Sequence, residues 1–199
     1  MNSKDKEQTI RRYESRFEEY GKSAKTMGWR DEEQQALRFK ILAQVANLEQ
    51  KKILDVGCGF GDLYTHLSKR GIDVHYTGYD ISPQILEIAK RDNSEIAFEV
   101  KDILTDTVAE KFDYVFSSGV FNHRISDNMN FTKEMIRKMF EIATDGISFN
   151  MLTNYVDYRE NNLFYYSPEE MFTFSQSLSR HLVLRHDYPL YEFTIFIYK

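Results

Sequence analysis

A glycine-rich segment and a later aspartate carry the clearest chemistry in this chain. Gly57-Cys58-Gly59-Phe60-Gly61 directly follows the short apolar run 52–56. Glycines at such a turn accept positive φ angles and carry no side chains, so a ligand can lie directly against the main chain. Asp80 ends the next apolar run, at about the 20-residue spacing where a carboxylate can accept hydrogen bonds from ribose hydroxyl groups. Together these residues predict a nucleoside-binding pocket.

Alternating strand and helix patterns must position these residues. Short apolar runs typical of strands occupy residues 52–56, 73–79, 96–100, 112–116, 146–151, 181–185 and 191–197. Ser82-Pro83 and Ser167-Pro168-Glu169-Glu170 are signals for the start of a helix. The link between the last two runs is too short for a parallel crossover, which predicts an antiparallel hairpin. We expect an α/β fold, a Rossmann-like three-layer sandwich with helices on both faces of a mostly parallel seven-stranded sheet and a C-terminal antiparallel hairpin.

The first 50 residues follow a helical pattern, which predicts two helices before the sheet. Ile10, Tyr13, Phe17 and Tyr20 recur at helical spacing, and Trp29 follows Gly28 in a polar segment where a tryptophan would lack a core. We therefore expect an N-terminal helical lid in residues 1–50, which closes over cofactor and acceptor, and a binding domain in residues 51–199.

The composition of the chain excludes several classes of protein. Its 199 residues fit one folded unit, and no apolar run approaches the roughly 20 residues that span a bilayer. The net charge of −5 comes from mixed acidic and basic residues, so no nucleic-acid partner and no membrane are expected. Cys58 is the only cysteine and the start of the chain is polar, which favours a cytoplasmic protein without a disulfide. No metal site is expected, and the oligomeric state stays open.

Three motifs resemble those of the class I S-adenosylmethionine-dependent methyltransferases. Residues 53–61, Ile-Leu-Asp-Val-Gly-Cys-Gly-Phe-Gly, resemble the first motif of that family, and Tyr79-Asp80-Ile81-Ser82 resembles the second. Lys101-Asp102-Ile103 lies where the family places an acid beside adenine. The resemblance covers residues 52–199, whereas the leading helices match only loosely. It implies a methyltransferase that uses S-adenosyl-L-methionine and releases S-adenosyl-L-homocysteine.

The same resemblance implies a set of cofactor contacts. Gly57, Cys58, Gly59 and Gly61 would lie against the methionine tail, with Asp55 near its amino group. The remaining contacts would come from the ends of later strands: Asp80 to the ribose diol, Asp102 to the adenine amino group, Ile81 and Ile103 to the adenine faces, and Ser118 and Gly119 to the sulfonium. Plain turn roles for Asp80 and Asp102 stay open as alternatives.

Two other functions share parts of this pattern. Nicotinamide-dependent oxidoreductases carry the motif Gly-x-Gly-x-x-Gly/Ala. In this chain Asp62 occupies the final position of the motif, where its carboxylate would repel a pyrophosphate at the helix N-terminus. A catalytically silent S-adenosylmethionine-binding protein would show the same fold and motifs as an enzyme, because function is decided by the site.

The acceptor is predicted only by class, as a small or medium-sized organic molecule methylated on oxygen or nitrogen. Methyl transfer from a sulfonium is an in-line displacement, so alignment supplies much of the catalysis and a base is needed only if the acceptor must lose a proton. His123 is the candidate general base, with a solvated loop histidine as its alternative. Candidates for the acceptor wall are Tyr13, Tyr20, Trp29, Asn122, Asn150 and Tyr158, although packing or turn roles are open for each. The segment 118–124 lacks the Asn/Asp-Pro-Pro-Tyr motif, which disfavours DNA bases and protein glutamine as acceptors.

Overall fold

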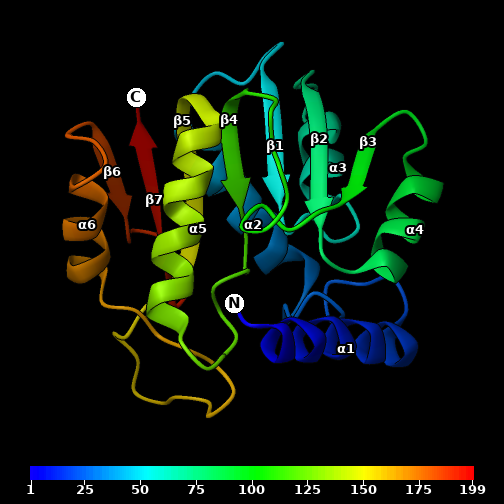
Figure 1. Ribbon diagram of the computed structural model, residues 1–199, viewed down its shortest axis with the longest axis horizontal. Helices are drawn as coiled ribbons and strands as arrows, with labels where there is room; N and C mark the ends of the chain where they lie inside the picture. Colours follow the sequence, from blue (N-terminus) through cyan, green and yellow to red (C-terminus); the bar gives the residue numbers. More distant parts are fainter.

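A computed structural model, which describes all of residues 1–199, contains one seven-stranded sheet in the order β3-β2-β1-β4-β5-β7-β6 (Figure 1). The strands are β1 Lys52–Val56, β2 His75–Asp80, β3 Ala97–Val100, β4 Phe112–Ser117, β5 Ala143–Leu152, β6 Leu182–Arg185 and β7 Glu192–Tyr198. Strands β1 to β5 pair in parallel, and β7 is antiparallel to both β5 and β6. The predicted closing hairpin is therefore confirmed, and the chain order reverses between β1 and β4, where open parallel sheets bind ligands.

Six α-helices surround the sheet (Figure 1). They are α1 Ser3–Tyr20, α2 Glu32–Leu42, α3 Asp62–Lys69, α4 Pro83–Asp92, α5 Asn128–Ile142 and α6 Pro168–Gln176, and a short 3₁₀ helix, η1, spans Ala43–Val45. Ser82 and Ser167 cap α4 and α6 as the sequence predicts, because each hydroxyl accepts the main-chain N–H three residues later. The connection from β3 to β4 forms turns and no helix, so the βα alternation is interrupted once.

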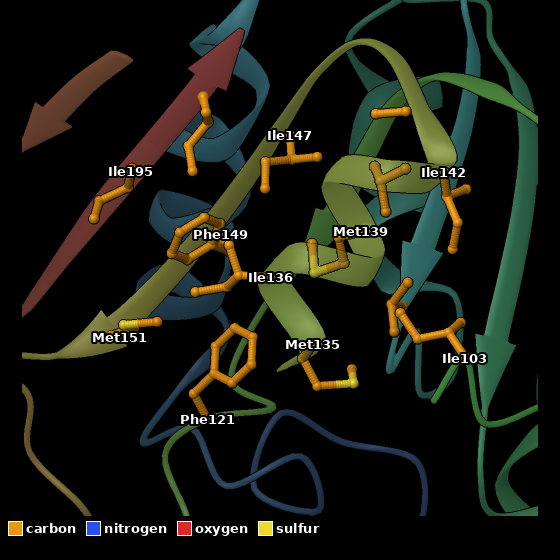
Figure 2. Close-up of a cluster of buried hydrophobic side chains, with 14 of the residues drawn as sticks. Ile103, Phe121, Met135, Ile136, Met139, Ile142, Ile147, Phe149, Met151 and Ile195 are labelled. Atoms are coloured by element: carbon orange, nitrogen blue, oxygen red, sulfur yellow. The ribbon is translucent and has the colours of Figure 1, made fainter. Parts of the chain in front are cut away.

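Two apolar cores, one on each face of the sheet, give the expected three layers. The first packs α5 and α6 against β4, β5 and β7, with Ile136, Met139 and Phe149 at its centre (Figure 2). The second packs α2, α3 and α4 against the opposite face and includes Phe39, Leu42 and Leu67. Burial of these side chains, each worth roughly 1.5–3 kcal/mol, supplies the main driving force for folding.

The two leading helices have different surroundings. Helix α1 lies across the carboxyl ends of β1 and β2 (Figure 1). Helix α2 belongs to the second core, and the Ser148 hydroxyl on β5 donates a hydrogen bond to the Leu42 carbonyl oxygen at 3.0 Å. This packing ties α2 to the sheet, whereas the sequence predicted a lid that extends to residue 50. None of the helices combines the length and apolar character that a membrane span requires.

Candidate functional site

A cavity of about 120 Å³ lies between α1 and the carboxyl edge of the sheet. Most of the residues predicted to bind the cofactor line it: Asp55, Gly57, Cys58, Gly59, Asp80, Ile81, Asp102, Ile103, Ser118 and Gly119. Tyr13, Trp29 and His123, which were predicted for the acceptor side, also line it. The fold therefore brings the ends of four strands and the N-terminal segment together around one space.

The loop after β1 needs glycine for two reasons. Gly57 and Gly59 have φ angles of 75° and 55°, in the left-handed region that other residues rarely adopt. A Cβ on Gly57 would overlap Val120 Cγ2, and one on Gly59 would lie 2.6 Å from Met27 Sδ. The main chain of this loop is thus closely covered by side chains from distant segments.

Gly61 packs against the sheet and, unlike Gly57 and Gly59, does not face the cavity. It precedes α3 with a φ of 77°, does not line the cavity, and a Cβ there would lie 2.7 Å from Phe98 Cζ. Its place in the motif reflects close packing of the turn against β3.

Asp80 joins the first two loops of the site. Its carboxylate accepts hydrogen bonds from the main-chain N–H groups of Gly59 and Ser82, both at 2.9 Å. Burial raises the pKa of Asp80, and these N–H donors oppose that rise. A carboxylate has about four lone-pair positions, so two donors leave capacity for hydroxyl groups in the cavity. The geometry therefore suits recognition of a diol.

Asp55, at the base of the cavity, is a buried carboxyl group. Its only side-chain partner is the Tyr76 hydroxyl, which donates a hydrogen bond at 2.7 Å. Burial raises the pKa of Asp55 from 3.8 to about 7, and the nearby Asp80 and Asp62 add to the rise. A cationic group bound beside Asp55 would favour its ionised form.

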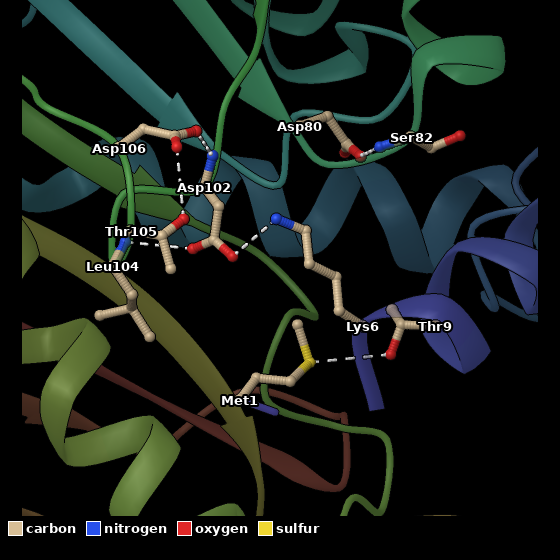
Figure 3. Close-up of polar contacts among 9 residues, drawn as sticks. All are labelled: Met1, Lys6, Thr9, Asp80, Ser82, Asp102, Leu104, Thr105 and Asp106. Carbon is tan, nitrogen blue, oxygen red and sulfur yellow. Dashed lines mark hydrogen bonds and ion pairs between the residues drawn. The ribbon is translucent and has the colours of Figure 1, made fainter. Parts of the chain in front are cut away.

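Asp102 binds one group from the turn after β3 and one group from helix α1 (Figure 3). Its carboxylate accepts hydrogen bonds from the Leu104 N–H at 3.1 Å and from the Lys6 ammonium group at 3.0 Å. Lys6 comes from α1, so the acid predicted to meet adenine is paired with the N-terminal helix. Sequence reasoning missed Lys6, although its spacing to Ile10 and Tyr13 places the three on one helix face.

His123 lies at the other end of the cavity, beside Tyr13 and Arg12. Its ring centroid is 5.8 Å from that of Tyr13 in an edge-on arrangement, and its Nδ1 is 2.8 Å from Arg12 Nη1. Since arginine can only donate, Nδ1 is assigned as the acceptor and the ring proton as belonging to Nε2. Burial, together with Arg12 and Arg16, lowers the pKa of His123 from 6.5 to about 4. The ring is therefore neutral at pH 7.

Four residues predicted for the acceptor wall do not line the cavity. Tyr158 is 77% exposed and Tyr20 is 41% exposed, so neither faces the site. Asn122 and Asn150 are buried behind the wall, where the Asn150 side chain accepts a hydrogen bond from the Gly119 N–H at 3.1 Å. Apolar residues that were not predicted for this wall line the cavity instead: Ile10, Val120, Ile125, Phe131 and Met135.

The charges of the cavity fit an adenosyl sulfonium and disfavour a dinucleotide. Asp62, at the start of α3, is bound by the Gln35 amide at 2.9 Å and lies where a dinucleotide would place its pyrophosphate. With Asp55, Asp80 and Asp102 it gives the lining four carboxyl groups. S-adenosylmethionine has no phosphate and carries a positive sulfonium and an amino group, so these acids can hold it.

Comparisons with known proteins agree with this geometry. A family model described as a methyltransferase domain matches residues 53–142. A protein of Mycobacterium tuberculosis that is named as a methyltransferase is 33% identical over 162 residues, which cover 74% of this chain and 92% of that protein.

Solved structures share the fold at low sequence identity. The complex of DhpI with S-adenosylhomocysteine (SAH) has a TM-score of 0.72 at 18% identity, with 98% of both chains covered. Magnesium protoporphyrin IX methyltransferase from Synechocystis PCC 6803, with bound SAH, has a TM-score of 0.64 at 16% identity, covering 83% of this chain and 82% of that one.

Proposed function

The chain belongs to the class I S-adenosylmethionine-dependent methyltransferases, and we propose that it methylates oxygen or nitrogen of a small or medium-sized organic acceptor. The observation that carries this proposal is the shared cavity, in which the glycine loop and Asp80 face Tyr13, Trp29 and His123. Because α1 lies across the carboxyl edge of the sheet, little room is left for a macromolecule.

We propose the cofactor contacts that the family resemblance implies, and the position of these residues around the cavity supports them. Asp80 holds the ribose diol, Asp102 meets the adenine amino group, and Asp55 lies near the amino group of the methionine tail. Ile81 and Ile103 pack against adenine, and Ser118 and Gly119 lie beside the sulfonium. The bound cofactor supplies an activated methyl group, and the protein aligns the acceptor and excludes water.

His123 is proposed to touch the acceptor as a hydrogen-bond donor. A general base needs a free lone pair, but Arg12 occupies Nδ1 and the proton resides on Nε2. The Asn162 main chain also hydrogen-bonds this ring, so we propose that the ring N–H is shared between the Asn162 carbonyl oxygen and the acceptor, whose nucleophilic atom it orients. Tyr13 packs edge-on against this ring and forms the adjoining wall.

Residues 1–31 are proposed to open and close over the cavity. Side-chain contacts that can break and re-form tie α1 to the site: Lys6 with Asp102, Arg12 with His123, and Glu14 with Ser82. The test is limited proteolysis in the loop 21–31, where S-adenosylhomocysteine should slow cleavage. Equal cleavage rates with and without this product would contradict a closing lid.

Methyl transfer itself is tested with cofactor radiolabelled in its methyl group. The purified protein is incubated with the small-molecule fraction and, separately, with the macromolecular fraction of a cell extract, and Asp80→Ala is the control. We expect label in the small-molecule products of the wild-type protein alone. Label in protein or nucleic acid would contradict a small acceptor, and binding without product in either fraction would indicate a silent binder.

A further inference from the structure

Glu192, the first residue of β7, is a buried carboxylate that the proposed chemistry does not use. It is 1% exposed, and its Oε1 accepts hydrogen bonds from Arg38 Nε at 2.8 Å and from Arg38 Nη2 at 2.5 Å. Its Oε2 accepts a hydrogen bond from the Asn150 side-chain amide at 2.8 Å. None of these three side chains lines the cavity.

Both partners of Glu192 lead to the same point in the cavity wall. Asn150 accepts the Gly119 N–H at 3.1 Å, and the Arg38 guanidinium stacks 4.0 Å above the Trp29 ring. Trp29 in turn packs on Gly119, where an added Cβ would lie 2.7 Å and 2.8 Å from two carbons of the indole ring. The Glu192 carboxylate thus contacts Gly119 through Asn150 and contacts Trp29, which packs on Gly119, through Arg38.

Stability alone is a weak explanation for this cluster. A buried ion pair loses the hydration of both charges, and well-packed apolar residues are often as stabilising. One Arg38 nitrogen, Nη1, is also left without a partner. The Gly119 loop has few polar contacts of its own to hold it, because the neighbouring Ser118 hydroxyl is buried without a partner.

We infer that Glu192 is a positioning residue for methyl transfer, which fixes the Gly119 loop through Asn150 and the Trp29 ring through Arg38. The inference rests on the proposed function, in which Gly119 lies beside the sulfonium. We call the contact through Asn150 the Asn150 arm and the contact through Arg38 the Arg38 arm, and a substitution can break one arm or both. Loss of the Asn150 arm releases the loop alone, whereas loss of the Glu192 charge releases both the loop and the ring.

Trp29 is the only tryptophan in the chain, so its fluorescence reports on the Arg38 arm directly. The variant Glu192→Gln keeps the side-chain shape and removes the charge. We expect quenching of Trp29 by acrylamide to increase about twofold and kcat to fall about 10-fold to 100-fold, since small misplacements of reacting groups cost this much. The Kd for S-adenosylhomocysteine should change by less than about threefold, because Asp80 and the glycine loop are untouched.

Two further variants separate positioning from general destabilisation. Asn150→Ala should lower kcat by about the same factor and leave Trp29 quenching unchanged. Ser175→Ala, on α6, removes a buried hydrogen bond to the Met171 carbonyl oxygen and leaves the hydrogen bonds of Glu192, Arg38 and Asn150 in place, so both readouts should match wild type. If Glu192→Gln fails to fold, Asn150→Ala decides the inference through kcat.

The outcomes distinguish this inference from the proposed function. Turnover is measured with the labelled cofactor and the small-molecule fraction described above. A wild-type protein without turnover would contradict the proposed function. An active wild type, with kcat and Trp29 quenching unchanged in Glu192→Gln, or with kcat unchanged in Asn150→Ala, would overturn the positioning role.

Discussion

Different kinds of groups line the two ends of the cavity, the end proposed for the cofactor and the end proposed for the acceptor. The end proposed for the cofactor consists of main-chain turns and carboxyl groups at the carboxyl ends of β1, β2 and β3, such as Gly59, Asp80 and Asp102. The proposed acceptor end consists of side chains from α1, the loop 21–31, the segment 118–127 and α5, which are aromatic, apolar or paired with arginine. Backbone turns fix a ligand shared by a whole family, whereas side chains from distant segments can vary with the acceptor.

The largest expected effect concerns the buried acid at the cofactor end. Burial raises the pKa of Asp55 to about 7, so its proton contributes stability that is fully present below pH 3.8 and is lost as the pH rises through about 7. Asp55→Asn never ionises. We expect its free energy of unfolding to gain about 1.4 kcal/mol per pH unit relative to wild type across this window.

Urea unfolding at several pH values between 4 and 8 measures this difference. Since His123 and all other groups are common to both proteins, their titrations cancel in the comparison. Asp157→Asn, at an exposed position, is the control, and its difference from wild type should stay small. A constant difference between Asp55→Asn and wild type would contradict a buried, proton-holding Asp55.

A smaller effect is expected at the acceptor end, where Arg12 helps to keep His123 neutral. Burial and Arg12 lower the pKa of His123 to about 4, so methyl transfer should be independent of this ring between pH 5.5 and 8. Arg12→Met should raise that pKa, although burial and Arg16 still hold it below the ordinary value of about 6.5, so any fall in kcat on acidification should begin at a higher pH than in wild type.

The pH profile of kcat, with NMR titration of the histidine ring protons, checks this prediction. Arg11→Met is the matched control, because Arg11 is an exposed neighbour that pairs only with Glu7 on the same helix. If Arg12→Met and wild type have the same profile, the arginine does not control the ring.

The smallest effect is expected from Lys6, which links the two ends. Lys6 pairs with Asp102, the acid proposed to meet adenine, so cofactor and lysine compete for one carboxylate. Lys6→Met should tighten binding of S-adenosylhomocysteine by about twofold to fivefold, since a partly exposed ion pair is worth less than about 1 kcal/mol. Lys4→Met, at an exposed position on α1, should leave the Kd unchanged. Weaker binding by Lys6→Met in calorimetric titration would show that Lys6 assists the cofactor.

The contrast between the two ends also explains what the sequence could predict. The glycine loop, Asp80 and the closing hairpin follow from short motifs and from link length, which act over a few residues. The 2.9 Å hydrogen bond from Gly59 to Asp80 joins the loop after β1 to the end of the neighbouring strand β2, two segments that the alternation of strand and helix already placed side by side.

Contacts between distant side chains could not be predicted in this way. Arg12 with His123, and Arg38 with Glu192, join residues 111 and 154 positions apart. A charged residue in a helix or at a strand end usually faces solvent, so its type does not indicate a buried partner. Asn150 was predicted at the acceptor wall, but its hydrogen bonds to Glu192 and Gly119 place it behind that wall.

Calorimetric titration tests the central claim, that this cavity binds an adenosyl sulfonium through Asp80. Wild type and Asp80→Ala are titrated with S-adenosylmethionine, S-adenosylhomocysteine and NAD. We predict micromolar binding of the two adenosyl-sulfur ligands to wild type, about −8 kcal/mol, at least about 100-fold weaker binding to Asp80→Ala, and no binding of NAD. Binding of NAD alone, or equal affinity of both proteins for S-adenosylhomocysteine, would contradict the account.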